Sequence, residues 1–323
     1  MEISIIVPVY NERENLPLLY QAVLQAVAPL RRTWELVLVD DGSRDGSVAV
    51  LEDLASCDRE HVRVVELRRN FGQTAAIAAG IDHSDGDVII LMDADLQNDP
   101  ADIPMLLEKI DEGYDVVSGW RKNRQDDLSR RLPSQLANRM ISWATGVSLH
   151  DYGCTLKAYR REVITGFRLY GEMHRFIPAF ANSYGARMIE VPVNHHPRRF
   201  GKAKYGLERT LKVVLDLMTV KFLSSYANKP IYLFGGAGAV LILISAIMLL
   251  YLFIRRVFFD ISVLSSPFFQ ISTMVFLMGF QSILMGLIAE LLVRTYHESQ
   301  DKPTYTVRKA HNVSNNGHAR RHE

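Results

Sequence analysis

The sequence predicts an α/β domain with a largely parallel sheet, followed by a C-terminal two-helix transmembrane hairpin. Over residues 1 to about 120, short β-branched runs alternate with helical patterns, which is typical of strands joined by crossover helices. After residue 230 the chain carries two apolar runs, each long enough to cross a bilayer core of about 30 Å.

Five short apolar runs are expected to form the sheet. The first four end in polar residues, and ligands of open α/β sheets bind at the carboxyl ends of the strands. We therefore expect a binding site at this edge. The runs are Ile3–Val9, Glu35–Val39, Val62–Leu67, Val88–Met92 and Asp115–Ser118.

A helix is expected directly after the first strand. Asn11 is placed to cap it, with Glu14 three residues further on as in a capping box. One face of this helix is apolar and should pack on the sheet. That face consists of Leu16, Leu19, Val23 and Val27.

The chain from about 121 to 200 is less regular in its pattern, and an amphipathic segment follows it. We expect a basic helical stretch around Arg130–Trp143 and a strand over Arg187–Asn194. The segment Leu207–Tyr226 is amphipathic and is interpreted as an interfacial helix in the lipid headgroup region. A domain helix that packs its apolar stripe inward is the alternative.

The two apolar runs predict membrane spans. Ile231–Ile254 carries no charge, and Phe268–Val293 carries only Glu290. Basic residues are concentrated before and after the pair, so the positive-inside rule places the α/β domain and both termini in the cytoplasm, at the plasma (inner) membrane. The flanking basic residues are Arg209, Lys212, Lys221, Lys229, Arg294, Lys302, Arg308 and Lys309.

These patterns divide the chain into four parts. They are the α/β domain over 1–204, the interfacial region over 205–229, the hairpin over 230–294 with spans at 231–254 and 268–293, and a tail over 295–323. The tail is expected to be disordered after Lys309 because it is polar and rich in His and Asn.

Composition narrows the class of protein. The chain has 37 basic and 36 acidic residues, a balance that argues against a nucleic-acid partner. Its two cysteines, Cys57 and Cys154, lack metal-ligand spacing and are expected to be thiols in a reducing compartment.

The sharpest local signal is the pair Asp93 and Asp95, which follows the expected strand Val88–Met92. Two ionised carboxylates this close repel each other unless a cation lies between them. Oxygen ligands favour Mg²⁺ or Mn²⁺, which neutralises charge on a leaving nucleotide diphosphate. A solvated turn is the alternative, but the hydrophobic strand before the pair favours a metal site.

Polar and acidic residues also follow the first two strands. An acidic side chain there can accept a hydrogen bond from a ribose hydroxyl or a base N–H. The sequence holds no glycine-rich phosphate-binding motif, so the phosphates should be held by metal and basic side chains. The motifs are V-P-V-Y-N-E, which ends at Glu12, and V-D-D-G-S-R-D-G-S, which begins at Val39.

These two motifs, followed by D-A-D-L-Q from Asp93, resemble glycosyltransferase family 2 in order and spacing. The later R-R-F-G-K-A-K-Y from Arg198, followed by two apolar runs, is similar to the polyisoprenyl-phosphate branch of that family. This branch includes dolichyl-phosphate mannose synthases and bacterial undecaprenyl-phosphate glucosyltransferases. The likeness covers the chain to about Tyr305.

The resemblance implies a GT-A (Rossmann-like) fold and assigns roles on the donor side. One group of residues would line the nucleoside pocket, a second would hold the metal and the donor diphosphate, and Arg121 would meet a donor phosphate. The first group is Pro8, Tyr10, Glu12, Asp40 and Asp41, and the second is Asp93, Asp95 and Gln97.

On the acceptor side, Arg130 or Arg131, with Arg198 and Lys204, would grip the lipid phosphate. Arginine suits bidentate phosphate binding, and lysine supplies a compact charge. A basic patch that attracts anionic lipids in general is the alternative. The family pattern has serine where this chain has Ala203, which removes one hydroxyl donor.

The resemblance also marks Asp151 as a catalytic residue beside Asp95, in the position of a candidate general base. A carboxylate that orients Arg198 or Lys204 is the alternative. The implied reaction is inverting transfer of a sugar, with UDP-glucose as the leading donor, to polyisoprenyl (undecaprenyl) phosphate. Such a product serves the modification of cell-envelope glycans.

Two other functions are considered. A processive polysaccharide synthase would carry Q-x-x-R-W and more spans, whereas the chain has Q-L-A-N-R-M from Gln135. A non-catalytic membrane scaffold that binds nucleotide sugar would not need the acidic and basic sets together. A homo-oligomer, with a tetramer as the candidate state, is a further expectation.

Overall fold

The computed structural model describes residues 1–122, 142, 146–166, 169, 173–197, 231–259, 266–299 and 305–313. The chain divides into two compact units, one formed by Met1–Val220 with Pro303–Glu323 and the other by Lys221–Lys302. A sheet and its helices make up the first unit, and two long helices make up the second. The predicted helices at Arg130–Trp143 and Leu207–Tyr226 lie outside the described residues, except for Ser142.

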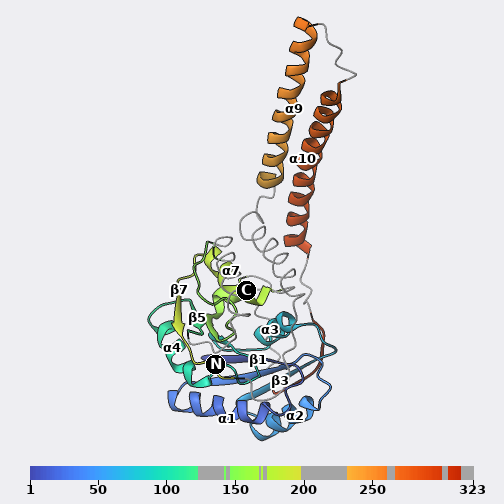
Figure 1. The fold of residues 1–323 in the computed structure, drawn as a ribbon. Helices are drawn as coiled ribbons and strands as arrows, with labels where there is room; N and C mark the ends of the chain where they lie inside the picture. The colour runs from blue at the N-terminus through green and yellow to red at the C-terminus, as the bar shows by residue number, and fades with distance from the viewer. Residues whose placement is uncertain are drawn as a thin grey trace. The chain divides into compact units, whose positions relative to one another are not determined.

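An eight-stranded sheet forms the centre of the first unit, in the order β7-β5-β6-β4-β1-β2-β3-β8 (Figure 1). The neighbours β3, β2, β1 and β4 are parallel, as are β5 and β7, whereas β6 and β8 run antiparallel to their neighbours. The strands are β1 Ile3–Val9, β2 Trp34–Asp40, β3 Val62–Leu67, β4 Val88–Leu91, β5 Val116–Trp120, β6 Lys157–Arg160, β7 Met188–Pro192 and β8 Val307–His311.

The predicted α/β class is confirmed, and the sheet is mixed rather than wholly parallel. The five expected strands agree with β1 to β5 to within two residues at each end, and β7 lies inside the expected Arg187–Asn194. The sequence did not predict β6, because its four residues, K-A-Y-R, begin and end with a charged residue. Its lysine is nevertheless buried.

Helices cover both faces of the sheet (Figure 1). Helix α3 (Gln73–Asp82) contacts β1, β2 and β3. A Cβ atom at Gly80 of α3 would lie 2.3 Å from Ile6 Cγ2, so this close approach requires glycine. The opposite face packs on α1 Leu16–Val27, α2 Ser47–Cys57 and α4 Ile103–Asp111.

The remaining described elements of the first unit are short. They are the helices α6 Arg161–Ile164 and α7 Ile177–Ser183, and the 3-10 helices η1 Ala28–Leu30, η2 Pro100–Asp102 and η3 Met173–Arg175.

Helix α1 has the predicted buried face of Leu16, Leu19, Val23 and Val27, but the predicted cap is wrong. The helix begins at Leu16, and the backbone of Asn11 is left-handed, with φ 54°. The Asn11 side chain accepts a hydrogen bond from Arg44 N at 2.8 Å. Asn11 therefore joins the two loops after β1 and β2 instead of capping the helix.

The C-terminal tail returns to the sheet as strand β8 beside β3. The expectation of disorder after Lys309 is wrong at Ala310 and His311, which lie in this strand. Tyr305 Oη donates to Asp82 Oδ2 at 2.7 Å, and Asn312 Nδ2 donates to the carbonyls of Ala55 and Val62. The tail is thus held in place by hydrogen bonds to β3 and to the ends of two helices, although its composition is polar.

The second unit consists of α9 (Ile231–Phe259) and α10 (Pro267–Ser299), which pack against each other. The stretches Phe234–Phe258 and Pro267–Ala289 are long and apolar enough to cross a membrane. They lie at the two runs that the sequence marked as spans.

Small residues allow close contact between these two helices. A Cβ atom at Gly238 would lie 2.5 Å from Gly279 O, and one at Gly279 would lie 2.8 Å from Gly238 O. Ser245 Oγ donates to Ser272 O at 2.8 Å. Such packing of small and hydroxyl residues is typical of helix pairs in lipid.

Candidate active site

The candidate site lies at the carboxyl edge of the sheet. Strands β1, β2, β4 and β5 end at this edge and the antiparallel β6 begins there, so the loops that follow or precede them meet. The loops after β2, β4 and β5 supply Asp41, Asp93 and Arg121, and the loop before β6 supplies Asp151. The topology therefore brings together residues that are up to 110 positions apart in sequence.

Asp93 is held from two sides. Its Oδ1 accepts a hydrogen bond from Gln73 Nε2 at 2.8 Å, and its Oδ2 accepts one from Thr155 Oγ1 at 2.5 Å. Burial and the neighbouring Asp95 raise the pKa of Asp93 to about 6, although Thr155, Arg121 and Gln73 act in the opposite direction. The carboxylate is thus fixed in place at a cost in desolvation and in repulsion from Asp95.

Asp95 is 7% exposed, and its Oδ1 accepts a hydrogen bond from Gln97 N at 3.1 Å. Leu96, between them, has a left-handed backbone with φ 59°. This tight turn orients the loop immediately after the two carboxylates.

The two carboxylates fit a divalent cation that is completed by substrate. Mg²⁺ and similar ions bind through one or two carboxylates, with phosphate oxygens and water as the other ligands. Burial, and then the charge of Asp95, raise the pKa of Asp93, and a bound cation would favour the charged carboxylate against both. Among the described residues, no group of three or more His, Cys, Asp or Glu side chains is placed to hold a metal.

Arg121 and Asp151 form a bidentate ion pair. Arg121 Nε donates to Asp151 Oδ2 at 2.7 Å, and Nη2 donates to Oδ1 at 2.9 Å. Asp151 is 3% exposed and also accepts from Gly153 N at 3.1 Å. The pair raises the pKa of the guanidinium, so the positive charge beside Asp93 is permanent.

Glu190 on β7 supports the loop that carries Asp151. Its carboxylate accepts hydrogen bonds from the backbone N–H groups of His150 and Asp151, and it lies 2.8 Å from His150 Nδ1. The His150 ring stacks on Trp120 with ring centroids 4.5 Å apart. Strand β7 and the end of β5 therefore hold this loop from two directions.

The loops after β1 and β2 form the other end of the site. Asp41 accepts hydrogen bonds from the backbone N–H groups of Phe71 and Gly72, at 2.7 and 3.0 Å. Asp40 Oδ2 accepts from the backbone N–H groups of Gly42 and Ser43, but its buried Oδ1 has no hydrogen-bond partner among the described residues. Burial raises the pKa of both carboxyl groups. An unpaired buried acceptor suits a donor group of a bound ligand.

Pro8, Tyr10 and Glu12 lie at the end of β1 and in the loop that follows it, and all three are half-buried. The backbone of Glu12 donates to Ser47 Oγ at 3.0 Å, and Asn15 Nδ2 donates to Glu12 Oε2 at 2.6 Å. The predicted acceptor residues Arg130, Arg131, Arg198 and Lys204 lie outside the described residues.

Sequence reasoning missed several side chains of the site. Gln73 and Thr155 bind Asp93, and Glu190 supports the loop with Asp151. No spacing signal marks them, because each lies on a different element and acts through a contact that only the fold creates. Glu190 could have been suspected as an acidic residue within an expected strand.

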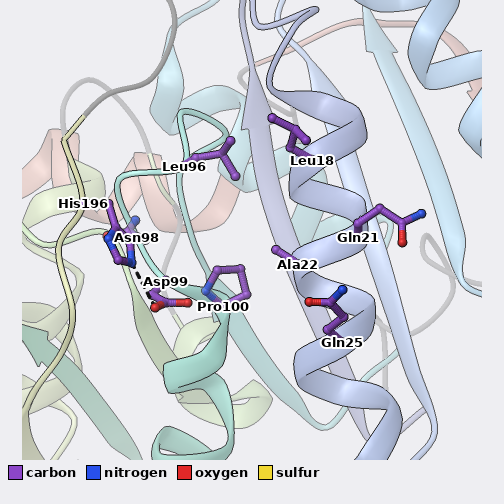
Figure 2. Close-up of a pocket in the computed structure, with 9 residues that line it drawn as sticks. All are labelled: Leu18, Gln21, Ala22, Gln25, Leu96, Asn98, Asp99, Pro100 and His196. Atoms are coloured by element: carbon purple, nitrogen blue, oxygen red, sulfur yellow. Dashed lines mark hydrogen bonds and ion pairs between the residues drawn. The ribbon is translucent and has the colours of Figure 1, made fainter.

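A pocket of about 220 Å³ lies between α1 and the segment 96–100 (Figure 2). It contains none of the predicted site residues. His196 Nε2 lies 3.0 Å from Asp99 Oδ2 on its wall. The other lining residues are Leu18, Gln21, Ala22, Gln25, Leu96, Asn98 and Pro100.

The mixed sheet, with the D-x-D carboxylates and the paired arginine at its carboxyl edge, defines a glycosyltransferase of the GT-A type. The chain belongs to glycosyltransferase family 2: the family model, described as "Glycosyl transferase family 2", matches residues 4–167. The family resemblance of the sequence motifs is thus confirmed, and the protein is an enzyme.

Two relatives are similar over nearly the whole chain. Dodecaprenyl-phosphate galacturonate synthase from Rhizobium johnstonii is 41% identical over 313 residues, which cover 96% of this chain and 93% of that protein. Undecaprenyl-phosphate 4-deoxy-4-formamido-L-arabinose transferase from Klebsiella pneumoniae is 40% identical over 309 residues, which cover 95% and 93%.

A solved structure agrees in fold. Glucosyl-3-phosphoglycerate synthase from Mycobacterium tuberculosis, crystallised with Mn²⁺ and UDP-glucose, matches with a TM-score of 0.50 and 18% identity, over 69% of this chain and 78% of that chain. At this identity the likeness shows the GT-A fold alone.

Proposed function

We propose that this enzyme transfers one sugar from a UDP-sugar to the phosphate of a polyprenyl lipid such as undecaprenyl phosphate, and releases UDP. The observation that carries the proposal is the likeness to relatives named for dodecaprenyl and undecaprenyl phosphate, which extends over the sheet and both apolar helices. A lipid acceptor also explains why a glycosyltransferase domain is joined to two helices that are apolar enough for a membrane.

The sugar is proposed to be a galacturonate or a 4-formamido-arabinose, because the two relatives are named for these sugars. Their names give no support to glucose, the sugar that the motifs alone suggested. The pathway that uses the product depends on which sugar is transferred, and the donor panel described below identifies that sugar.

Asp93 and Asp95, with Gln97 beside them, are the residues proposed to hold Mg²⁺ or Mn²⁺. When bound, the ion would supply positive charge to the leaving diphosphate. Arg121 adds a second, fixed positive charge close to Asp93, and Asp151 keeps its guanidinium oriented. We propose that Arg121 contacts a donor phosphate, and that the unpaired Asp40 Oδ1 accepts a hydrogen bond from the nucleoside.

The transfer itself is proposed as a single displacement. An oxygen of the lipid phosphate attacks the anomeric carbon, the bond from that carbon to the UDP oxygen breaks, and the configuration inverts. A phosphate monoester has a second pKa near 6 and is mostly dianionic at neutral pH, so no proton needs to be removed. Arg130 or Arg131, Arg198 and Lys204 are proposed to bind this phosphate.

Strand β8 supports a cytoplasmic position for both ends of the hairpin. β8 follows α10 in the chain, yet it pairs with β3, which precedes α9. The chain must therefore return to the side of the membrane from which it left, which requires an even number of crossings. Together with the positive-inside bias, this pairing supports the proposal that the sheet domain lies on the cytoplasmic face of the inner membrane.

The test is a donor panel. Purified full-length protein in detergent, with undecaprenyl phosphate and Mn²⁺, is given one labelled donor at a time: UDP-galacturonate, UDP-4-deoxy-4-formamido-L-arabinose or UDP-glucose. One of the first two is expected to give a lipid-extractable product that carries a single sugar. Product from UDP-glucose alone would overturn the sugar assignment, and a polymeric product would overturn single transfer.

A further inference from the structure

Lys157 is a buried lysine that the proposed reaction does not use directly. It is the first residue of β6, where it pairs with Leu91 of β4 on one side and with Ser118 of β5 on the other. Only 3% of its surface is exposed. Lysine is almost never this buried without partners, because removing an ammonium group from water is costly.

The partners of this ammonium group are two backbone carbonyls. Lys157 Nζ donates to Cys154 O at 2.5 Å and to Tyr152 O at 3.1 Å. Both carbonyls belong to the turn 151–155, which leads into β6. The Lys157 side chain thus links the Tyr152 and Cys154 carbonyls of the turn.

The ends of this turn hold the two charged groups of the site. At one end, Asp151 binds Arg121 through both carboxylate oxygens. At the other end, Thr155 donates to Asp93. The relative position of the arginine and the D-x-D carboxylate therefore depends on the shape of the turn.

We propose that Lys157 is a positioning residue, which fixes the turn 151–155 so that Arg121 and Asp93 face the donor diphosphate and its cation together. The proposal rests on the proposed function for the identity of that ligand. It does not require Lys157 to touch substrate. Without the ammonium group, the carbonyls of Tyr152 and Cys154 would each lose the hydrogen bond from Lys157, and the turn would be held less firmly.

A structural role alone predicts a different outcome, and Arg63 provides the matched control. Arg63 is also buried and charged, and it binds Glu35 at 2.5 Å and Asp85 at 2.8 Å. These residues lie at the start of β2 and β3 and before β4, at the opposite edge of the sheet. Arg63→Met should lower thermal stability without altering the site.

The experiment compares Lys157→Met, which has no donor, and Lys157→Gln, which keeps an amide donor, with Arg63→Met in full-length protein. Calorimetry measures UDP affinity in the presence of Mn²⁺, hydrogen exchange follows residues 151–156, and thermal unfolding gives Tm. Lys157→Met is expected to bind UDP about tenfold more weakly, with Lys157→Gln between it and the wild type. Exchange at 151–156 should rise in both, and Arg63→Met should change Tm alone.

UDP affinity that is unchanged in the Lys157 variants, or reduced no more than in Arg63→Met, would overturn the proposal, as would unchanged exchange at 151–156. If Lys157→Met is not recovered folded, Lys157→Gln against Arg63→Met decides by the same criteria. Absence of UDP binding by the wild type would instead contradict the proposed donor. The exchange measurement and a titration with Mn²⁺ alone would then still decide the role of Lys157.

Discussion

Arg121 binds both oxygens of Asp151, with Nε to Oδ2 at 2.7 Å and Nη2 to Oδ1 at 2.9 Å. The sequence left two roles open for Asp151, a general base or a carboxylate that orients Arg198 or Lys204. Because both oxygens accept hydrogen bonds from one guanidinium, the geometry favours an orienting role. The residue that is oriented is Arg121, which the sequence assigned to the donor phosphate.

Asp151→Asn is therefore expected to reduce kcat/KM by about 10²- to 10³-fold at every pH from 6 to 9, because a buried ion pair loses one partner. A general base would give a deficit that narrows as the lipid phosphate ionises. The measurement is the pH profile of transfer. In a double-mutant cycle, Asp151→Asn should add little to Arg121→Ala. A deficit that disappears above pH 7 would restore the base.

Metal affinity should depend on pH through Asp93, whose pKa is raised to about 6. Below this value a proton competes with the cation, so Mn²⁺ affinity should fall by about tenfold per pH unit, and above it affinity should level off. Because the pKa of Asp93 is higher in the folded protein than in the unfolded chain, the metal-free fold loses stability as pH rises towards 6. Mn²⁺ binds the ionised carboxylate more tightly, so it should raise Tm more at pH 7 than at pH 5. Calorimetry and thermal unfolding test both. Affinity that is flat from pH 5 to 7 would contradict the account.

Arg198→Ala and Lys204→Ala should weaken use of the lipid phosphate much more than binding of the donor. Loss of one charge-assisted phosphate contact is expected to cost about 2 to 5 kcal/mol of transition-state stabilisation. The readout is the KM for undecaprenyl phosphate beside the UDP affinity of the same variants. If UDP affinity collapses while the lipid KM stays at the wild-type value, the acceptor assignment is wrong.

Tyr305→Phe should loosen the return of the tail to the sheet. It removes the hydroxyl that donates to Asp82, a bond worth about 0.5 to 1.5 kcal/mol, and should lower Tm by a few degrees. Arg308→Ala is the control, because the Arg308 side chain is 68% exposed in its ion pair with Glu66, so solvent screens the pair and its contribution should be small. Equal Tm values for the two variants would show that Tyr305 does not anchor the strand.

Periodicity and motifs predicted much of the fold and the position of the site. β1 and β3 have the expected bounds, and Asp93 and Asp95 follow β4 as expected, because apolar strands that are followed by polar residues leave a clear pattern. Strand β8 left no such pattern. Its sequence V-R-K-A-H is polar, and only pairing with β3 makes it a strand.

The side chains that hold the site residues in place could not be predicted either, because they leave no sequence pattern. Gln73 begins a helix and Thr155 precedes a short strand, and neither type of residue signals a site. Both become partners of Asp93 only when α3 and β6 are packed beside the end of β4. Lys157 was equally hidden, because a lysine in sequence indicates a surface position.

In the proposed reaction, a sugar is transferred to a lipid phosphate at the D-x-D carboxylates. The most direct test incubates full-length enzyme with the labelled donor selected by the panel, with and without undecaprenyl phosphate, with Mn²⁺ or excess chelator, and as wild type or Asp95→Ala. We expect a lipid-extractable sugar phosphate, with the anomeric configuration inverted relative to the donor, only when lipid, cation and Asp95 are all present, with Asp95→Ala folded as judged by its Tm. Full activity in chelator, or product formed equally without undecaprenyl phosphate, would contradict the account.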